Sequence, residues 1–151
     1  TIQIIRKISQ ELRPSVLDDL GLVSANDWLK EQYARSTDIN FDINMPSEEI
    51  NINGEYATAI FRITQEALTN IMRHSKAKNV DIHMKLNNSE IFLKIKDDGK
   101  GISMSKHIHQ HKTFGVFGMK ERASNLGGEL LILDNEGPGT TVKLVLPYTQ
   151  N

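Results

Sequence analysis

The feature that most constrains this chain is a pair of segments between residues 80 and 95 in which apolar and polar residues alternate. Alternation with a period of two places the apolar side chains on one face of a β-strand. The two segments flank Asn87 and Asn88, a residue type that favours turns. The apolar positions are Val80, Ile82, Met84, Leu86, Ile91, Leu93 and Ile95. The pattern predicts a β-hairpin, and any fold of this chain must accommodate it.

Helical and strand signals surround this hairpin. Apolar residues at helical spacing predict a helical arm over residues 1 to about 36, with an interruption at Pro14. The other predicted elements are a strand over 39–43, a helix over 55–75, a short helix over 116–126 that ends at Gly127 and Gly128, and strands over 130–132 and 141–147. Strands joined by hairpins with helices between them indicate an α+β fold, a two-layer α/β sandwich with an N-terminal helical arm.

Composition narrows the functional classes. The chain has 151 residues, of which 38% are hydrophobic and 25% charged, as in a globular domain with a short appendage. A net charge of −1 without a Lys/Arg cluster argues against nucleic acid as a partner. The absence of cysteine excludes disulfides and thiolate metal sites. No apolar run is long enough to cross a bilayer, so we expect no membrane contact by these residues. Because the chain begins at Thr1 inside a helical pattern, we expect it to be a piece of a longer protein.

A polar stripe on the long predicted helix is the first candidate site. Glu66, Asn70 and His74 are four residues apart and span about 80° of the helix surface, beside its apolar face. Carboxylate and amide oxygens suit Mg²⁺, so Glu66 and Asn70 are better candidate ligands than His74. The alternative is an ordinary solvated edge of an amphipathic helix.

Three glycine-containing segments are further candidates. Residues 97–101 (Asp-Asp-Gly-Lys-Gly) follow a strand, where glycine allows close backbone approach and a carboxylate can accept from an amine such as that of adenine. Residues 115–119 (Gly-Val-Phe-Gly-Met) open the short helix, and backbone N–H groups at a helix start attract phosphate. Residues 137–141 (Gly-Pro-Gly-Thr-Thr) enter the last strand. The alternatives are a plain turn, a loop-to-helix junction and a hairpin turn, respectively.

The polar loop predicted over residues 97–113 contains His107, His109 and His111. Alternate histidines can bind zinc, but no cysteine or flanking carboxylate supports a closed site, and a histidine-rich lid is the favoured interpretation. The phosphate loop of P-loop NTPases, the dinucleotide fingerprint and the protein-kinase motifs are all absent from the sequence.

Taken together and in order, these segments resemble the GHKL-type ATP-binding catalytic domain of two-component sensor histidine kinases, which has the Bergerat fold. The matching segments are 61–77, 97–101, 114–122 with 126–128, and 137–141. Upstream, residues 11–14 and 20–22 resemble the end of the dimerisation domain in the nitrate-sensor-like subfamily. The resemblance implies that residues 1–36 are the C-terminal remnant of the dimerisation and histidine-phosphotransfer helices with a linker. Residues 37–150 would be the ATP-binding catalytic domain.

The resemblance also implies cofactors and residue roles. ATP and Mg²⁺ would be bound, with Glu66 and Asn70 as the catalytic pair: Asn70 would ligate the metal and Glu66 would act through a water. Asp97 would read the adenine amino group, Thr141 would support the adenine side, and residues 103–113 would form a lid. The implied ATP-binding set is Glu66, Asn70, His74, Asp97, Gly99, Gly101, Ile102, Gly115, Val116, Gly118, Met119 and Thr141.

Two departures from the family pattern stand out. Thr113 occupies the position where many members have the first glycine of the second glycine box. The phospho-acceptor is also missing, because none of the five histidines is followed by the acidic residue that the subfamily carries there. We therefore expect ATP·Mg²⁺ binding without autophosphorylation by these residues alone.

The implied partners are a response regulator and a second copy of the parent protein, which would dimerise through its helices. The domain would be cytoplasmic, in a parent anchored in the bacterial inner membrane. Two other functions stay open at this point: a GHKL serine kinase or ATPase of the anti-sigma type, with Glu66 as base, and a non-catalytic nucleotide-binding regulatory module.

Overall fold

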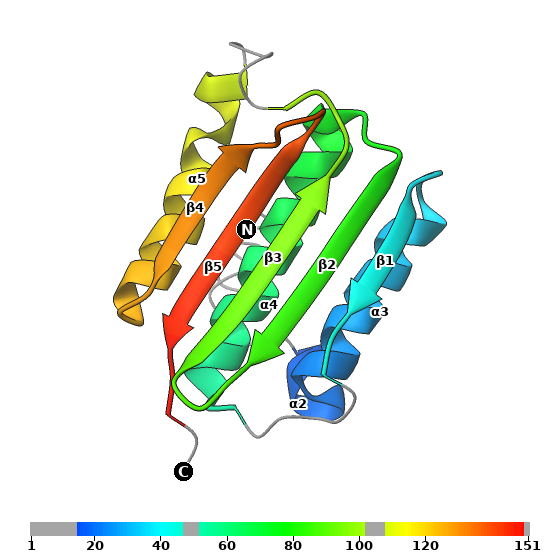
Figure 1. Ribbon diagram of the computed structural model, residues 1–151. Helices are drawn as coiled ribbons and strands as arrows, with labels where there is room; N and C mark the ends of the chain where they lie inside the picture. The colour runs from blue at the N-terminus through cyan, green and yellow to red at the C-terminus, as the bar shows by residue number, and fades with distance from the viewer. Residues whose placement is uncertain (1–14, 47–51, 102–107, 150–151) are drawn as a thin grey trace, which may run out of the picture.

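The protein folds into two layers, a five-stranded sheet with its helices on one face (Figure 1). The computed structural model describes residues 15–46, 52–101 and 108–149, and within the last range it describes side chains from Gly115 onward. The expected α+β two-layer sandwich is confirmed. No helix in the described ranges is both long enough and apolar enough to cross a membrane.

The sheet has the strand order β1-β2-β3-β5-β4. Its strands are β1 (Asn40–Asn44), β2 (Asn79–Leu86), β3 (Glu90–Asp97), β4 (Glu129–Asp134) and β5 (Thr140–Pro147). β1 pairs with β2 in parallel, and the other neighbours are antiparallel. This order places β3 and β5 at the centre, so the glycine turns that follow β3 and precede β5 lie at the same end of the sheet.

The predicted hairpin is confirmed as β2–β3, with Leu86 opposite Ile91. Its turn depends on Asn87, whose side-chain oxygen accepts hydrogen bonds from the main-chain N–H groups of Ser89 at 2.9 Å and Glu90 at 2.8 Å. Side-chain hydrogen bonds of this kind stabilise a turn, which explains why the chain reverses direction between β2 and β3.

The helices are α2 (Ser15–Leu20), α3 (Leu22–Arg35), α4 (Gly54–Asn70) and α5 (Ile108–Asn125). α4 begins where Asn53 Oδ1 accepts from the N–H of Glu55 at 2.9 Å, a typical N-cap. It continues into a single π-helical turn, η1 (Ile71–Ser75), which ends at Lys76 in the left-handed conformation with φ 53°. The predicted helix over 55–75 is therefore present, and its last turn is wider than an α-helix.

The prediction that residues 97–113 form a loop and that the next helix starts near Val116 is wrong. α5 starts at Ile108, eight residues earlier, because no proline or glycine separates Ile108 from Gly115 and nothing stops the helix there. The predicted end is confirmed: Gly127 adopts φ 75° and Gly128 N–H donates to the carbonyl of Ala123 at 2.9 Å.

The core lies between the inner face of the sheet and the helices. Leu93, Leu144 and Leu146 from the sheet are fully buried against Ile60 and Ile63 of α4. The same core includes apolar side chains of the two N-terminal helices, namely Leu17, Leu22, Ala25 and Leu29. The hydroxyl groups of Tyr33 and Thr69 also join α3 to α4 at 2.7 Å. The described part of the helical arm is thus packed onto the sandwich. Its contacts with α4 help to hold that helix in place over the sheet.

Candidate functional site

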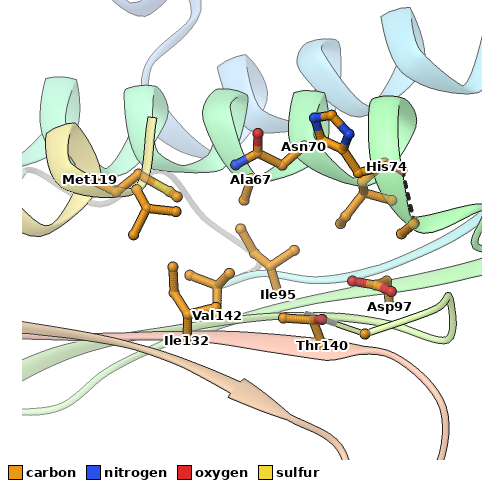
Figure 2. A pocket seen from close by; sticks show the side chains of 13 residues that line it. Ala67, Asn70, His74, Ile95, Asp97, Met119, Ile132, Thr140 and Val142 are labelled. Carbon is orange, nitrogen blue, oxygen red and sulfur yellow. Dashed lines mark hydrogen bonds between the residues drawn. The ribbon is translucent and has the colours of Figure 1, made fainter. Parts of the chain in front are cut away.

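A cavity lies between the C-terminal end of α4 and the sheet, at the end where β3 finishes and β5 begins. Figure 2 shows Asn70 and His74 on the helix side of this cavity and Asp97 and Thr140 on the sheet side. The lining, named here the α4 cavity, consists of Ala67, Asn70, Ile71, His74, Ser75, Ile95, Asp97, Gly101, Val116, Met119, Ile132, Thr140 and Val142. Its volume is about 40 Å³. Most of the lining is apolar, and its polar side chains are those of Asn70, His74, Ser75, Asp97 and Thr140.

Asp97 is the polar group most deeply embedded in this site, with 4% of its surface exposed. It is the last residue of β3, and its Oδ1 accepts a hydrogen bond from the N–H of Gly99 at 2.8 Å. That bond fixes the carboxylate at the end of an apolar surface that includes Ile95 and Val142. A fixed carboxylate beside an apolar surface suits an apolar or aromatic ligand that carries an amine donor.

Glycine is required around Asp97 because the backbone segments approach very closely. A Cβ on Gly99 would overlap the carbonyl of Ser75, to which Lys100 N–H donates at 2.8 Å. Gly139 adopts φ 104°, and a Cβ there would overlap the main-chain carbonyl of Asp97. Gly99 and Gly139 therefore allow the backbones of η1, β3 and β5 to pack closely around the Asp97 carboxylate. Neither glycine lines the α4 cavity.

Asn135 is a residue that the sequence did not single out. Its side-chain nitrogen donates to the carbonyls of Asp97 at 2.9 Å and Pro138 at 3.0 Å, and its oxygen accepts from the Thr141 hydroxyl. One side chain thus connects the end of β3 to the turn before β5. In the sequence it is one more asparagine in a turn, and nothing there marks it as the residue that holds the carbonyl of Asp97.

Thr141 does not line the cavity; its neighbour Thr140 does. Successive strand residues point to opposite faces of a sheet, so Thr140 and Val142 face the helices while Thr141 faces the other way. Thr140 thus lines the cavity, whereas Thr141 reaches this end of the sheet only through its bond to Asn135.

Asp98 holds the start of β2 and lies outside the α4 cavity. Its carboxylate accepts from the main-chain N–H groups of Lys78 at 2.8 Å and Asn79 at 2.9 Å, and from the Asn79 side chain at 2.8 Å. The Asn79 side-chain bond is the main reason that the pKa of Asp98 lies below its ordinary value, and the backbone bonds lower it further. The two adjacent aspartates therefore have different roles: Asp97 faces a cavity and Asp98 stabilises the fold.

Replacing Asp98 should lower stability in a pH-dependent way. We expect Asp98→Asn to reduce the free energy of unfolding by about 1–2 kcal/mol at neutral pH, since hydrogen bonds to a charged group are lost from a partly solvated site. Because the folded pKa is depressed, this stabilisation is present above about pH 4, the range of an unfolded aspartate, and is lost as the pH falls through the folded pKa. Urea unfolding of both proteins at neutral and acid pH measures it, with Asp42→Asn on exposed β1 as the control. An equal difference at both pH values would contradict the assignment.

The remaining predicted residues divide between two places. Glu66, Gly115 and Gly118 lie outside the α4 cavity, in an adjacent open groove between α4 and α5 with a volume of about 290 Å³. This arginine groove is lined by Arg62, Gln65, Glu66, Gly115, Gly118, Met119 and Arg122. Met119 borders both hollows, so they lie next to each other. Ile102, His107 and most of the predicted lid lie outside the described residues, as do the side chains of His109 and His111.

The sequence predicted Gly115 at the start of a helix. In the structure it lies inside α5 instead, where it is close to Glu66. A Cβ on Gly115 would overlap the Glu66 carboxylate, so glycine allows α4 and α5 to approach here. Gly118 has open space around it. Glycine inside a helix costs about 0.5–1 kcal/mol relative to alanine, so Gly115 and Gly118 weaken the middle of α5.

The oxygen groups available for a metal fit magnesium better than a transition metal. Among the described residues, no group of three or more His, Cys, Asp or Glu side chains gathers in one place. Mg²⁺ does not need such a cage, because it is usually held by one or two protein oxygens together with substrate phosphates and water. Asn70 and Glu66, one helical turn apart on α4, offer that arrangement.

Comparison with known proteins assigns the family. Residues 55–150 match the family described as histidine kinase-, DNA gyrase B-, and HSP90-like ATPase. The chain belongs to this family. The resemblance to the GHKL-type domain of sensor histidine kinases is thereby confirmed. The residues of this ATPase-family domain that surround the α4 cavity all lie inside the matched range.

Sensor histidine kinases from other bacteria are similar to this chain over most of its length. The domain is 34% identical over 143 residues to the sensor histidine kinase LiaS of Bacillus subtilis (strain 168), which covers 95% of the chain and 39% of LiaS. It is 32% identical over 148 residues to the oxygen sensor histidine kinase NreB of Staphylococcus carnosus (strain TM300), covering 98% of the chain and 42% of NreB. The chain thus spans about two fifths of the length of these relatives.

Solved structures show the same fold. A blue-light activated histidine kinase from Erythrobacter litoralis EL346 aligns with a TM-score of 0.68 at 20% identity, over 87% of this chain and 42% of that one. The ATP binding domain of PrrB from Mycobacterium tuberculosis aligns with a TM-score of 0.64 at 17% identity, over 84% and 93% of the two chains. At such identities the likeness concerns the fold alone.

Proposed function

We propose that this ATPase-family domain binds ATP with Mg²⁺ and serves as the phosphoryl donor in histidine phosphorylation during two-component signalling. One observation carries the proposal: a buried carboxylate, Asp97, lies at the end of an apolar cavity whose opposite wall presents Asn70 and His74. An apolar cavity with a carboxylate on one wall and an amide oxygen on the other offers the groups that the base and the metal of an adenine nucleotide need.

At the base end, the chain's own groups supply recognition. Oδ2 of the Asp97 carboxylate would accept from the exocyclic amine of adenine, while Ile95, Met119 and Val142 would pack on the ring. Thr140 would support this side of the base. A keto group at the same position of guanine is an acceptor and would face the carboxylate with no proton between them, so adenine is preferred.

At the phosphate end, Asn70 would contribute an oxygen to the metal and Glu66 would act through a water. Mg²⁺, when bound, would neutralise charge on the phosphates and help to orient them for transfer. His74, on the same helix edge, would lie near the phosphates. Positioning and charge neutralisation dominate phosphoryl transfer, so this domain needs no covalent step of its own.

Nucleotide binding would also require movement of α5. The α4 cavity holds about 40 Å³, whereas small-molecule sites are typically about 300–1,000 Å³. Val116 and Met119 of α5 form one wall, and Gly115 and Gly118 weaken the helix next to them. We infer that α5 moves away from α4 when the base enters, and that unwinding near Gly115 and Gly118 would turn their N–H groups towards the phosphates.

Removing the proposed metal ligand should abolish the effect of magnesium on binding. We expect Asn70→Ala to weaken ATP binding about tenfold or more in the presence of Mg²⁺ and to change it little when the metal is chelated. Calorimetric titration with and without chelator measures this, with Asn44→Ala at the exposed end of β1 as the matched control. If the variant responded to Mg²⁺ as the wild type does, the metal assignment to Asn70 would be wrong.

The kinase role itself is tested by phosphoryl transfer in trans. The domain is mixed with a separately produced dimerisation domain of the same parent that carries its histidine, and with ATP labelled in the terminal phosphate. Label on that histidine, lost in a histidine-to-glutamine acceptor, is the expected result. Release of labelled phosphate without labelled protein would indicate a hydrolytic ATPase instead. A response regulator as the next acceptor, dimerisation and a cytoplasmic position in a membrane-anchored parent belong to the same proposal.

A further inference from the structure

The arginine groove brings two guanidinium groups together from different helices. Arg62 comes from α4 and Arg122 from the last turn of α5, and both side chains are half-buried. Nη1 of Arg62 donates to Oε1 of Gln65 at 2.9 Å, which restrains the position of the Arg62 guanidinium.

The two guanidinium groups of the groove are close enough to affect each other. The pKa of Arg62 is lowered, first by burial and then by the nearby positive charge of Arg122. The Arg62 guanidinium remains protonated at neutral pH because arginine starts from a very high pKa. Among the charged residues that line the groove in the described part of the chain, two are cations and one, Glu66, is an anion. An anion in the groove would relieve the repulsion between the two arginines.

The groove also lies where the phosphates of a bound nucleotide would emerge. It shares Met119 with the α4 cavity, and Glu66 is about 6 Å along α4 from Asn70. A polyphosphate whose base occupies the α4 cavity and whose metal is held at Asn70 and Glu66 therefore extends towards the arginines. The long side chains of Arg62 and Arg122 can bend over this end of the groove.

We propose that Arg62 and Arg122 together bind the terminal phosphate of the nucleoside triphosphate. This inference rests on the proposed function and deepens it, because it makes the groove the element that distinguishes ATP from ADP. A guanidinium donates two parallel hydrogen bonds to phosphate oxygens, and a pair from two helices holds the group from two sides. Since one arginine comes from α4 and the other from α5, the terminal phosphate would also hold the two helices together.

The test compares ATP and ADP affinities in single variants. For Arg62→Gln and Arg122→Gln, we expect the affinity for a non-hydrolysable ATP analogue with Mg²⁺ to fall about tenfold or more, and the affinity for ADP with Mg²⁺ to stay within about twofold. The matched control is Arg35→Gln, an exposed arginine at the end of α3 that removes the same charge far from the groove. Thermal unfolding of each variant without ligand shows whether it is folded as well as the wild type.

The affinities for ADP and for the ATP analogue distinguish the possible outcomes. The proposal is supported if both groove variants lose affinity for the ATP analogue but not for ADP, while Arg35→Gln keeps the wild-type affinities. If Arg122→Lys also binds the ATP analogue weakly, a positive charge alone is not enough and the planar guanidinium is needed. Equal loss of both nucleotides, or no loss of either, overturns it. A wild-type domain that binds ADP and the ATP analogue equally well also overturns it while leaving nucleotide binding intact. A folded wild type that binds neither nucleotide defeats the proposed function itself.

Discussion

Gly139→Ala should be one of the most damaging small changes in this domain. We expect it to lower the free energy of unfolding by about 2–4 kcal/mol, because two independent penalties coincide. The residue adopts φ 104°, a conformation that side chains rarely tolerate, and the added methyl group would overlap the main-chain carbonyl of Asp97. The end of β3 and the turn before β5 would have to separate.

Gly137→Ala provides a control two residues away in the same turn. A methyl group there meets no atom within 4 Å, and its φ is not in the range that favours glycine, so we expect a change of about 0.5 kcal/mol or less. Urea unfolding of both variants measures the difference. If the two variants proved equally stable, the close packing of Gly139 on Asp97 would not exist in solution.

Asp97→Asn should remove most of the affinity for adenine nucleotides. Oδ1 of Asp97 accepts from the N–H of Gly99, so in the variant the amide oxygen is held there and the NH₂ group replaces the other carboxylate oxygen. A donor would then face the donor on adenine, and the negative charge would also be gone. We expect about a 100-fold loss in ATP and ADP affinity, which corresponds to about 2.8 kcal/mol.

The comparison needs a control for charge and one for base identity. Asp81→Asn makes the same substitution on the exposed side of β2, away from the cavity, and should leave ATP affinity unchanged. Weak binding of GTP should not fall further in the Asp97→Asn variant, since guanine has no amine at that position. A parallel loss of ATP and GTP affinity would show that Asp97 supports the fold of the site without reading the base.

The sequence predicted the elements of the fold well where periodicity is strong. The alternation that predicted β2 and β3 is confirmed because one face of each strand is buried, and Leu93 and Ile95 are among the most buried residues. Likewise α4 follows its apolar stripe. The start of α5 was missed because its first turns carry polar residues with no helical apolar stripe, so the segment looked like a loop.

The candidate site was predicted less completely, for geometric reasons. The four-residue spacing along α4 correctly brought Asn70 and His74 to one edge, but it could not show that Glu66 lies in a different hollow. The sequence singled out Thr141 but not Thr140, which lines the cavity, because the face to which each residue of β5 points depends on the strand register. Asn135 and the pairing of Arg62 with Arg122 depend on contacts between distant segments, which no local pattern reports.

The roles of the glycines illustrate the same difference. The sequence indicated that glycines 99 and 101 allow a ligand to approach the backbone. In the structure Gly99 instead admits the carbonyl of Ser75, and Gly101, with φ 81°, lies beside Asp134 while lining the cavity. Close packing of backbone on backbone and close approach to a ligand require the same residue, and only the three-dimensional contacts distinguish them.

The central claim is that the hollow between α4 and the end of β3 takes an adenine nucleotide with its metal. Calorimetric titration of the folded domain with ATP, in buffer with Mg²⁺ and again with chelator, tests it most directly. Saturable binding of one nucleotide per chain, strengthened by Mg²⁺ and competed by ADP, is the result we predict. A domain that unfolds cooperatively on heating, and is therefore folded, yet gives no binding heat or competition with either nucleotide would contradict the account.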